Sequence, residues 1–115
     1  MAELQEIMEG LMTELKRGTI VLCVLSSLQE KQYGYSLSQA LEEKGITVDQ
    51  NTLYPLLRRL EKQQLLQSDW ILEDNRPRRY YMLNENGKMI LQQLKNEWEK
   101  ISRSIEQIIS GKEGR

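Results

Sequence analysis

Residues 49–66 read DQNTLYPLLRRLEKQQLL, and this stretch decides the fold. Its leucines recur with helical spacing and form a stripe that fits a buried face: Leu53, Leu56, Leu57 and Leu60. Polar and charged side chains fall on the other side of the same helix: Gln50, Asn51, Tyr54, Arg58 and Lys62, with Arg59 at the flank. A helix that only fills a core does not need such a face. The stretch therefore predicts a helix that packs with one side and touches a partner with the other.

Two residues compete to begin this helix. Asp49 is the preferred N-cap and Thr52 the alternative, because both side chains can accept a hydrogen bond from a backbone N–H of the first turn. Pro55 costs nothing in the first turn if Thr52 caps, and forfeits one hydrogen bond if Asp49 caps. In either case the proline marks the beginning of a helix rather than its middle.

The first 28 residues predict helix as well. An apolar three-four repeat from Leu4 to Leu15 indicates an amphipathic helix, which Gly18 either breaks or merely weakens. Residues 19–28 are apolar nearly all round, and this pattern is typical of a helix buried on most sides.

A further helix is expected within YGYSLSQALEEKG, residues 33–45. Ser36 is expected to cap it, with Gln39 three residues later as in a capping box. Gly45 suits the left-handed position that follows a last helical turn.

Two short strands are expected after the decisive helix, at SDWILE (68–73) and RRYYML (78–83), because both are rich in aromatic and branched residues. The turn that joins them gathers three arginines: Arg76, Arg78 and Arg79. Asn84 can then cap a final helix that runs to about Ile109. At 1.5 Å per residue that helix is roughly 37 Å long, more than a three-helix core can cover.

Apolar residues along the final helix alternate steps of three and four, which predicts a heptad seam for a partner chain: Leu91, Leu94, Trp98, Ile101, Ile105 and Ile108. The alternative is that the seam lies back on its own domain. Residues 110–115 are expected to form a flexible tail. The domain organisation expected is thus 1–83 for a first unit that includes the N-terminal helix, 84–109 for the dimerisation helix and 110–115 for the tail.

The composition excludes several classes of protein. The chain has 115 residues and a net charge of −1, which fits one domain and argues against indiscriminate coating of nucleic acid, although a local basic face remains compatible. Histidine is absent and Cys23 is the one cysteine, so histidine-based catalysis, Cys/His zinc sites and an intrachain disulfide are excluded. We expect that the protein is not an enzyme and that it binds neither a cofactor nor a metal. The longest apolar run is too short for a bilayer, so we expect a soluble cytoplasmic protein.

The order of the elements is that of a winged helix-turn-helix: a mainly α fold with a two-stranded β wing, followed by a C-terminal dimerisation helix. Its third helix would enter the major groove of DNA, where Gln50 and Asn51 can bond base edges and Tyr54 and Arg58 can reach bases or phosphates. The wing arginines would flank the duplex. Backbone N–H groups at Tyr35 and Ser36 could bind a phosphate.

Two other interpretations stay open at this point. Arg58 and Arg59 could form a solvated face that pairs with acids such as Glu61 or Glu30. The winged helix could also serve as a protein–protein module without a DNA partner.

Three segments together resemble the PadR family of transcriptional regulators: YGYSLSQALEEKG, NTLYPLLRRLEKQQLL and RPRRYYMLNENGKMIL. The resemblance covers roughly residues 16–109 and implies a homodimeric winged-helix repressor that dimerises through its N- and C-terminal helices. It also implies DNA contacts from the third helix and the wing: Tyr35, Asn51, Thr52, Tyr54, Arg58, Arg76, Arg78 and Arg79. The chain departs from the family pattern at Asn75, where glycine is frequent, and at Asn84, where threonine is frequent.

Some PadR-like regulators resemble this chain in placing a tryptophan at the position of Trp98, with a gap between the indoles of the two subunits. This resemblance implies an effector site for planar aromatic or phenolic compounds, lined by Trp98, Leu91, Ser102, Thr19 and Cys23. The alternative is that the indole of Trp98 simply packs in the dimer interface.

Overall fold

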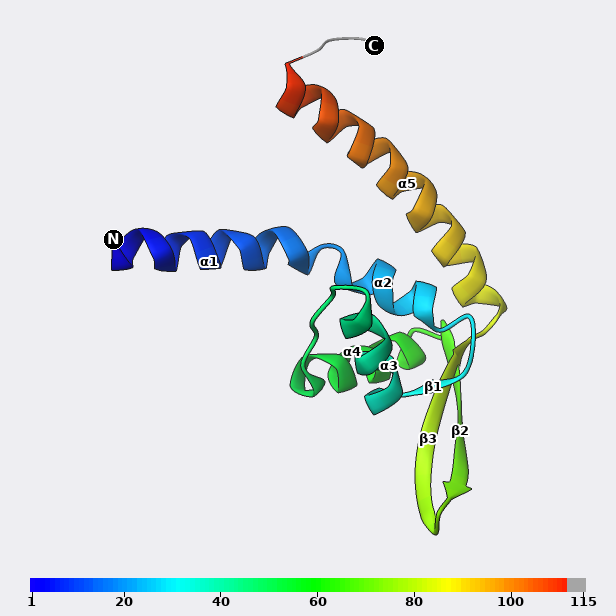
Figure 1. Ribbon diagram of the computed structural model, residues 1–115. Helices are drawn as coiled ribbons and strands as arrows, with labels where there is room; N and C mark the ends of the chain where they lie inside the picture. Colours follow the sequence, from blue (N-terminus) through cyan, green and yellow to red (C-terminus); the bar gives the residue numbers. More distant parts are fainter. Residues whose placement is uncertain (112–115) are drawn as a thin grey trace.

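The computed structural model of the chain describes residues 1–111. Along the sequence its elements are α1 (Ala2–Arg17), α2 (Ile20–Ser27), β1 (Gln32–Tyr33), α3 (Gly34–Glu43), α4 (Gln50–Lys62), β2 (Leu66–Glu73), β3 (Arg76–Leu83) and α5 (Glu85–Ser110). Helices α2, α3 and α4 gather beside a long β hairpin, while α1 and α5 project away from this centre (Figure 1). The predicted fold, mainly helical with a β wing, is confirmed.

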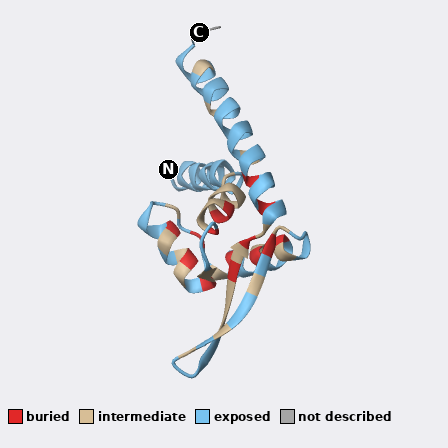
Figure 2. Ribbon diagram, turned by 90° about the vertical axis from the view of Figure 1, so that its right-hand side faces the viewer, coloured by how far each residue is buried: buried red, intermediate tan, exposed pale blue. Residues whose placement is uncertain are grey.

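The core lies where the three central helices meet the root of the hairpin (Figure 2). It is built mainly of leucines, and the decisive helix supplies Leu53, Leu57 and Leu60, while Leu56 is only partly buried. From α2 the core takes Val24 and Leu25, whereas the residues from Ile20 to Cys23 stay half-buried. Helix α2 is therefore less enclosed than its all-apolar sequence predicts.

Asp49 begins the decisive helix. Its Oδ1 accepts a hydrogen bond of 2.9 Å from the backbone N–H of Thr52, so Asp49 and not Thr52 is the N-cap of α4. Pro55 consequently lies inside the helix, where its ring nitrogen cannot donate to the carbonyl one turn earlier.

Helix α3 begins earlier than expected, so the prediction that Ser36 caps it is wrong. Tyr33 is the N-cap, and Ser36 stands in the first turn, where its Oγ accepts a 3.2 Å hydrogen bond from the N–H of Tyr33. The serine still satisfies a backbone donor at the start of the helix, from inside the turn rather than before it. At the other end Gly45 has a φ of 90°, as the left-handed position after a helix requires.

The sheet has three strands in the order β1-β3-β2 and is antiparallel throughout. The two wing strands were expected, although each begins two residues earlier than its aromatic run. Asp74 and Asn75 form the turn with φ values of 51° and 62°, the conformation that a tight two-residue hairpin needs. Asparagine tolerates this conformation well, so Asn75 fills the place of a glycine. Strand β1 was not predicted.

The two long helices differ from the centre in their exposure. Helix α1 has no buried residue, and its apolar stripe from Leu4 to Leu15 is 46–75% exposed. This helix ends at Arg17 and α2 begins at Ile20, so Gly18 interrupts the helix. Among residues 1–111 no helix is long and apolar enough to cross a membrane.

Helix α5 begins with Asn84 as its N-cap, as expected, and the side chain accepts a 2.8 Å hydrogen bond from the N–H of Gly87. Its far end includes Ser110, which the sequence assigned to the tail, and Gly111 closes it with a φ of 72°. The rest of the expected tail, 112–115, lies outside the described residues.

Candidate nucleic-acid interface

A groove of about 610 Å³ opens between the start of α3, the exposed side of α4 and the wing. Arginine and aromatic side chains dominate its lining: Tyr33, Gly34, Tyr35, Tyr54, Arg58, Trp70, Arg76, Pro77, Arg78, Arg79 and Tyr81. Four of these residues are arginines and none is acidic. A groove with positive charge and aromatic faces suits a polyanion that carries planar bases.

The exposed side of α4 carries the residues predicted to face a partner. Tyr54 and Arg58 line the groove, whereas Asn51 and Thr52 are exposed near the start of the helix and Gln50 is half-buried there. Arg58 and Arg59 do not form the ion pairs of a solvated face, because no carboxylate among residues 1–111 lies within 4.0 Å of either guanidinium. Glu61, the nearest candidate in sequence, is paired elsewhere.

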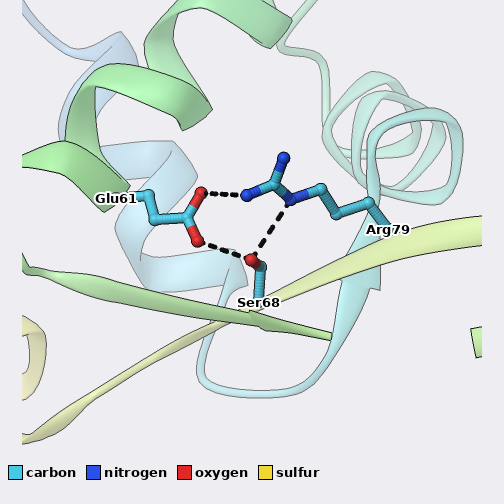
Figure 3. Close-up of polar contacts among 3 residues, drawn as sticks. All are labelled: Glu61, Ser68 and Arg79. Atoms are coloured by element: carbon cyan, nitrogen blue, oxygen red, sulfur yellow. Dashed lines mark hydrogen bonds and ion pairs between the residues drawn. The ribbon is translucent and has the colours of Figure 1, made fainter. Parts of the chain in front are cut away.

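The three wing arginines, predicted as one group, separate onto two faces. Because side chains alternate along a strand, Arg76 and Arg78 lie on one face of β3 and Arg79 on the other. The guanidinium of Arg78 stands 4.5 Å from the ring centroid of Tyr33, while Arg79 reaches Glu61 of α4 with an Nη2–Oε1 distance of 2.7 Å (Figure 3). The wing thus offers two arginines whose charge is not neutralised within residues 1–111 and one whose charge is.

Two wing tyrosines keep their protons beyond the ordinary range. A hydrogen bond from Tyr80 to the carboxylate of Glu73 is the main reason that the pKa of Tyr80 is raised. Burial raises the pKa of Tyr81, and the nearby positive charge of Arg79 opposes that shift. At neutral pH both phenols are therefore protonated, and Tyr81, the one of the two that lines the groove, carries no negative charge there.

The start of α3 carries Tyr35 and Ser36, whose backbone N–H groups are predicted to bind a phosphate, and their two side chains have different surroundings. Tyr35 lines the groove, and its hydroxyl accepts a 2.9 Å hydrogen bond from Gln39. Ser36 is half-buried and its Oγ lies 2.7 Å from Oε1 of Gln32, to which it donates. Ser36 is thus engaged within its own chain, while Tyr35 faces the groove.

Five groove residues were missed from the sequence: Tyr33, Gly34, Trp70, Pro77 and Tyr81. Two of them show why. Trp70 is 66% exposed and lies opposite Arg79 in the strand register. Its position in the groove follows from the pairing of β2 with β3, which the sequence alone does not reveal. Gly34 packs so closely against the ring of Tyr54 that an added Cβ would lie 2.5 Å from a ring carbon. Glycine at this position therefore leaves room for the tyrosine, a requirement that no local pattern reveals.

The residues of the predicted seam on α5 differ in how deeply they are buried. Leu91 is only 4% exposed and belongs to the core of its own chain, and Leu94 packs partly against the same core. Beyond them Trp98, Ile101 and Ile105 are 44–48% exposed. Of the other residues assigned to an effector site, Thr19, Cys23 and Ser102 are all half-buried.

The model of the "Transcriptional regulator PadR-like family" matches residues 21–93, more than half of the chain. The chain belongs to this family. A PadR-family transcriptional regulator from Eggerthella lenta has a similar crystal structure, with 36% identity, a TM-score of 0.89 and full coverage of both chains. A transcriptional regulator from Streptococcus is 34% identical, with a TM-score of 0.74 over 84% of this chain and 97% of its own.

A "Transcriptional regulator" of Mycobacterium tuberculosis is 33% identical over 95 residues, which are 82% of this chain and 89% of that protein. The family consists of DNA-binding regulators of transcription and not of enzymes. This PadR-like regulator therefore presents an arginine-rich groove between α4 and the wing, the part of the fold where winged helices bind DNA.

Proposed function

We propose that the chain is a homodimeric, cytoplasmic repressor that binds operator DNA with α4 and the wing. The observation that carries this proposal is the groove between these elements, which is lined by four arginines, five aromatic residues and no carboxylate. Three of these arginines, Arg58, Arg76 and Arg78, form no ion pair within residues 1–111, and a protein–protein module has no need of such unneutralised guanidinium groups. Because the net charge of the whole chain is −1, this concentration of positive charge is local.

In the proposed complex α4 lies in the major groove. Gln50 and Asn51, at the start of the helix, read base edges, and Thr52, Tyr54 and Arg58 reach bases or phosphates. Arg59, Arg76 and Arg78 contribute phosphate contacts, with the N–H groups at the start of α3 beside Tyr35 as a further one. The helix would therefore supply specificity and the wing affinity.

Dimerisation would proceed through α1 and the outer part of α5. The support for it is the apolar stripe of α1, which has no buried residue, and the exposed seam from Trp98 to Ile108. Leu94 continues the seam toward the core, whereas Leu91 has little surface left for a partner. A dimer would place two recognition helices at the fixed spacing that two half-sites require.

Release from DNA would follow the binding of a planar aromatic or phenolic effector between the two subunits. Trp98 is the proposed stacking residue, because its indole is 48% exposed and lies on α5 beyond the core. Ser102, one turn further along α5, Thr19 at the N-cap of α2 and Cys23 in the first half of α2 would complete the site together with Leu91. An effector that prefers one spacing of the subunits would shift the population away from the DNA-binding form.

The DNA-binding proposal is tested by selection from a random DNA pool followed by titration at several salt concentrations. We expect Asn51→Ala to cost about 1–3 kcal/mol at the selected site and to flatten the preference among sites. Arg78→Ala should weaken all sites similarly and reduce the salt slope by about one. If no DNA from the pool binds in a salt-dependent way, the protein–protein interpretation holds instead. If Arg78→Ala flattens the preference among sites and Asn51→Ala weakens all sites equally, the assignment of α4 to the major groove is wrong.

The effector proposal is tested by tryptophan fluorescence. The chain has two tryptophans, so Trp70→Phe leaves the emission of Trp98 alone. A panel of planar aromatic compounds should include members that quench this emission and lower DNA affinity. If none does so, and Trp98→Ala only loosens the dimer, Trp98 is an interface residue and no effector binds there.

A further inference from the structure

Three polar side chains join the recognition helix to the wing (Figure 3). Arg79 of β3 donates from Nη2 to Oε1 of Glu61 on α4 over 2.7 Å, and from Nε to Oγ of Ser68 on β2 over 3.2 Å. Ser68 in turn donates to the other carboxylate oxygen of Glu61 over 2.5 Å. The result is a closed triangle between one helix and two strands, which we call the wing clamp.

We propose that the wing clamp of Glu61, Ser68 and Arg79 sets the position of the wing relative to α4, so that Arg79 is a positioning residue and not a phosphate ligand. The consequence for DNA binding rests on the proposed function. The consequence for the wing itself does not, since the clamp lies within a single chain.

The location of the clamp explains why the wing needs it. The buried residues of the two strands are Leu66, Tyr81 and Leu83, and none lies nearer the hairpin tip than the level of Ser68, which pairs with Tyr81. Further toward the tip, residues of both strands are exposed or half-buried. The apolar core therefore fixes only the root of the wing, and the clamp is placed where that packing ends.

The surroundings of Arg79 leave it poorly suited to bind a phosphate. Its guanidinium lies 5.5 Å from the ring centroid of Tyr81 and 5.8 Å from that of Trp70, in addition to its two hydrogen bonds. Its side chain is 37% exposed and that of Glu61 is 27% exposed, so the pair is partly shielded from solvent. A phosphate at Arg79 would compete with the carboxylate of Glu61 for the same guanidinium and would lie close to that negative charge.

The two possible roles of Arg79 differ in what the removal of Glu61 does. If Arg79 binds phosphate, Glu61→Gln frees its charge and DNA binding stays the same or becomes tighter. If Arg79 belongs to the clamp, Glu61→Gln loosens the wing and binding becomes weaker. The double change Glu61→Gln with Arg79→Gln leaves the net charge of the chain unaltered and separates the two roles further. It removes a positive charge that contacts a phosphate only if Arg79 is a phosphate ligand.

The test in the free protein measures hydrogen exchange of the wing amides, residues 68–79, in the full chain. We expect Glu61→Gln, Arg79→Gln and the double variant each to raise exchange by about twofold to fivefold, the range of a partly exposed ion pair. The double variant should be no worse than the single ones, because all three break the same unit. Arg76→Gln, on the opposite face of β3 and exposed beside the turn, is the matched control and should leave exchange unchanged. Unaltered exchange in both single variants would overturn the clamp, whether or not the protein binds DNA.

The test on DNA uses the same variants with the selected operator over a salt series. We expect Glu61→Gln and Arg79→Gln to weaken binding by about threefold each, and the double variant to keep the salt slope of the unaltered protein, while Arg76→Gln lowers it by about one. A double variant whose slope falls by one, together with tighter binding by Glu61→Gln, would make Arg79 a phosphate ligand. Failure of every DNA to bind would refute the proposed function and leave the exchange result intact.

Discussion

The winged centre and the two projecting helices bury their apolar side chains to very different extents. In α4 the stripe of Leu53, Leu57 and Leu60 is at most 2% exposed, although the helix is polar on its other side. In α1 an apolar stripe of similar regularity has no buried member, and α5 changes from buried at Leu91 to exposed at Trp98. One chain is therefore enough to complete the core of the winged unit, whereas its long helices leave apolar surface exposed that the proposed dimer would cover.

The two regions should respond to different kinds of partner. Covering a large aliphatic side chain contributes about 1.5–3 kcal/mol, so two helices with exposed stripes have a strong tendency to associate. The groove of the winged unit has the opposite character, because its arginines gain most from an anion and little from apolar contact. We therefore expect changes in the projecting helices to alter assembly and changes in the winged unit to alter stability or DNA binding.

The largest effect is expected from charges placed in the seam. Ile101→Asp with Ile105→Asp puts two carboxylates per chain where a partner would cover them, at a cost of at least about 4 kcal/mol, or roughly a thousandfold in the Kd of the dimer. Sedimentation should then report a monomer, and circular dichroism should still report a folded winged unit. Operator binding should be lost as well, because a monomer cannot contact two half-sites at their fixed spacing.

A matched control carries the same charges on the polar side of α5. Gln92→Asp with Asn96→Asp keeps the four-residue spacing and adds the same charge, and both positions are exposed. This variant should remain a dimer. If the seam variant also stays dimeric and active, the exposed stripe of α5 packs elsewhere and the contrast between the two regions fails.

A smaller effect is expected where α5 meets the winged unit. Gly87 packs so tightly that an added Cβ would lie 2.2 Å from the backbone oxygen of Leu65, which also accepts a hydrogen bond from the N–H of Asn84. Because backbone must shift, Gly87→Ala should lower the free energy of unfolding by roughly 2–3 kcal/mol, within the range for overpacking. Urea unfolding at one fixed protein concentration measures this change.

Gly10→Ala is the control for that measurement, because nothing lies within 4 Å of a Cβ at Gly10 in α1. Alanine favours a helix over glycine, so this change should be neutral or stabilising by up to about 1 kcal/mol. Equal losses in the two variants would mean that α1 is packed as closely as the start of α5, contrary to the exposure of its stripe.

The sequence was enough to predict elements with a regular pattern of side chains, but not contacts between residues that are far apart in the chain. Helical spacing predicted α4 and α5, and alternation with aromatic residues predicted both wing strands. Strand β1 is only two residues long, too short for any period to register. The partner of Arg79, Glu61, lies 18 residues away on another element. The sequence alone therefore could not show that Arg79 differs in its contacts from Arg76 and Arg78.

Local signals failed in a similar way at the start of α3. The serine pattern suggested Ser36 as a cap, but the chain enters the helix from β1, and this pairing puts Tyr33 at the N-cap. In α4 the sequence favoured Asp49 over Thr52 as the N-cap, and the structure confirms this preference, although both residues suit the position.

That competition yields the smallest predicted effect. Asp49→Ala removes the oxygen that accepts from the N–H of Thr52, so the free energy of unfolding should fall by about 1 kcal/mol. Thr52→Ala keeps that N–H and should change the free energy of unfolding by no more than about 0.5 kcal/mol. Both measurements use urea unfolding at one protein concentration, and sedimentation should find the dimer intact, because the cap belongs to the winged unit. A loss from Thr52→Ala as large as that from Asp49→Ala would mean that α4 begins three residues later, with Pro55 in its first turn.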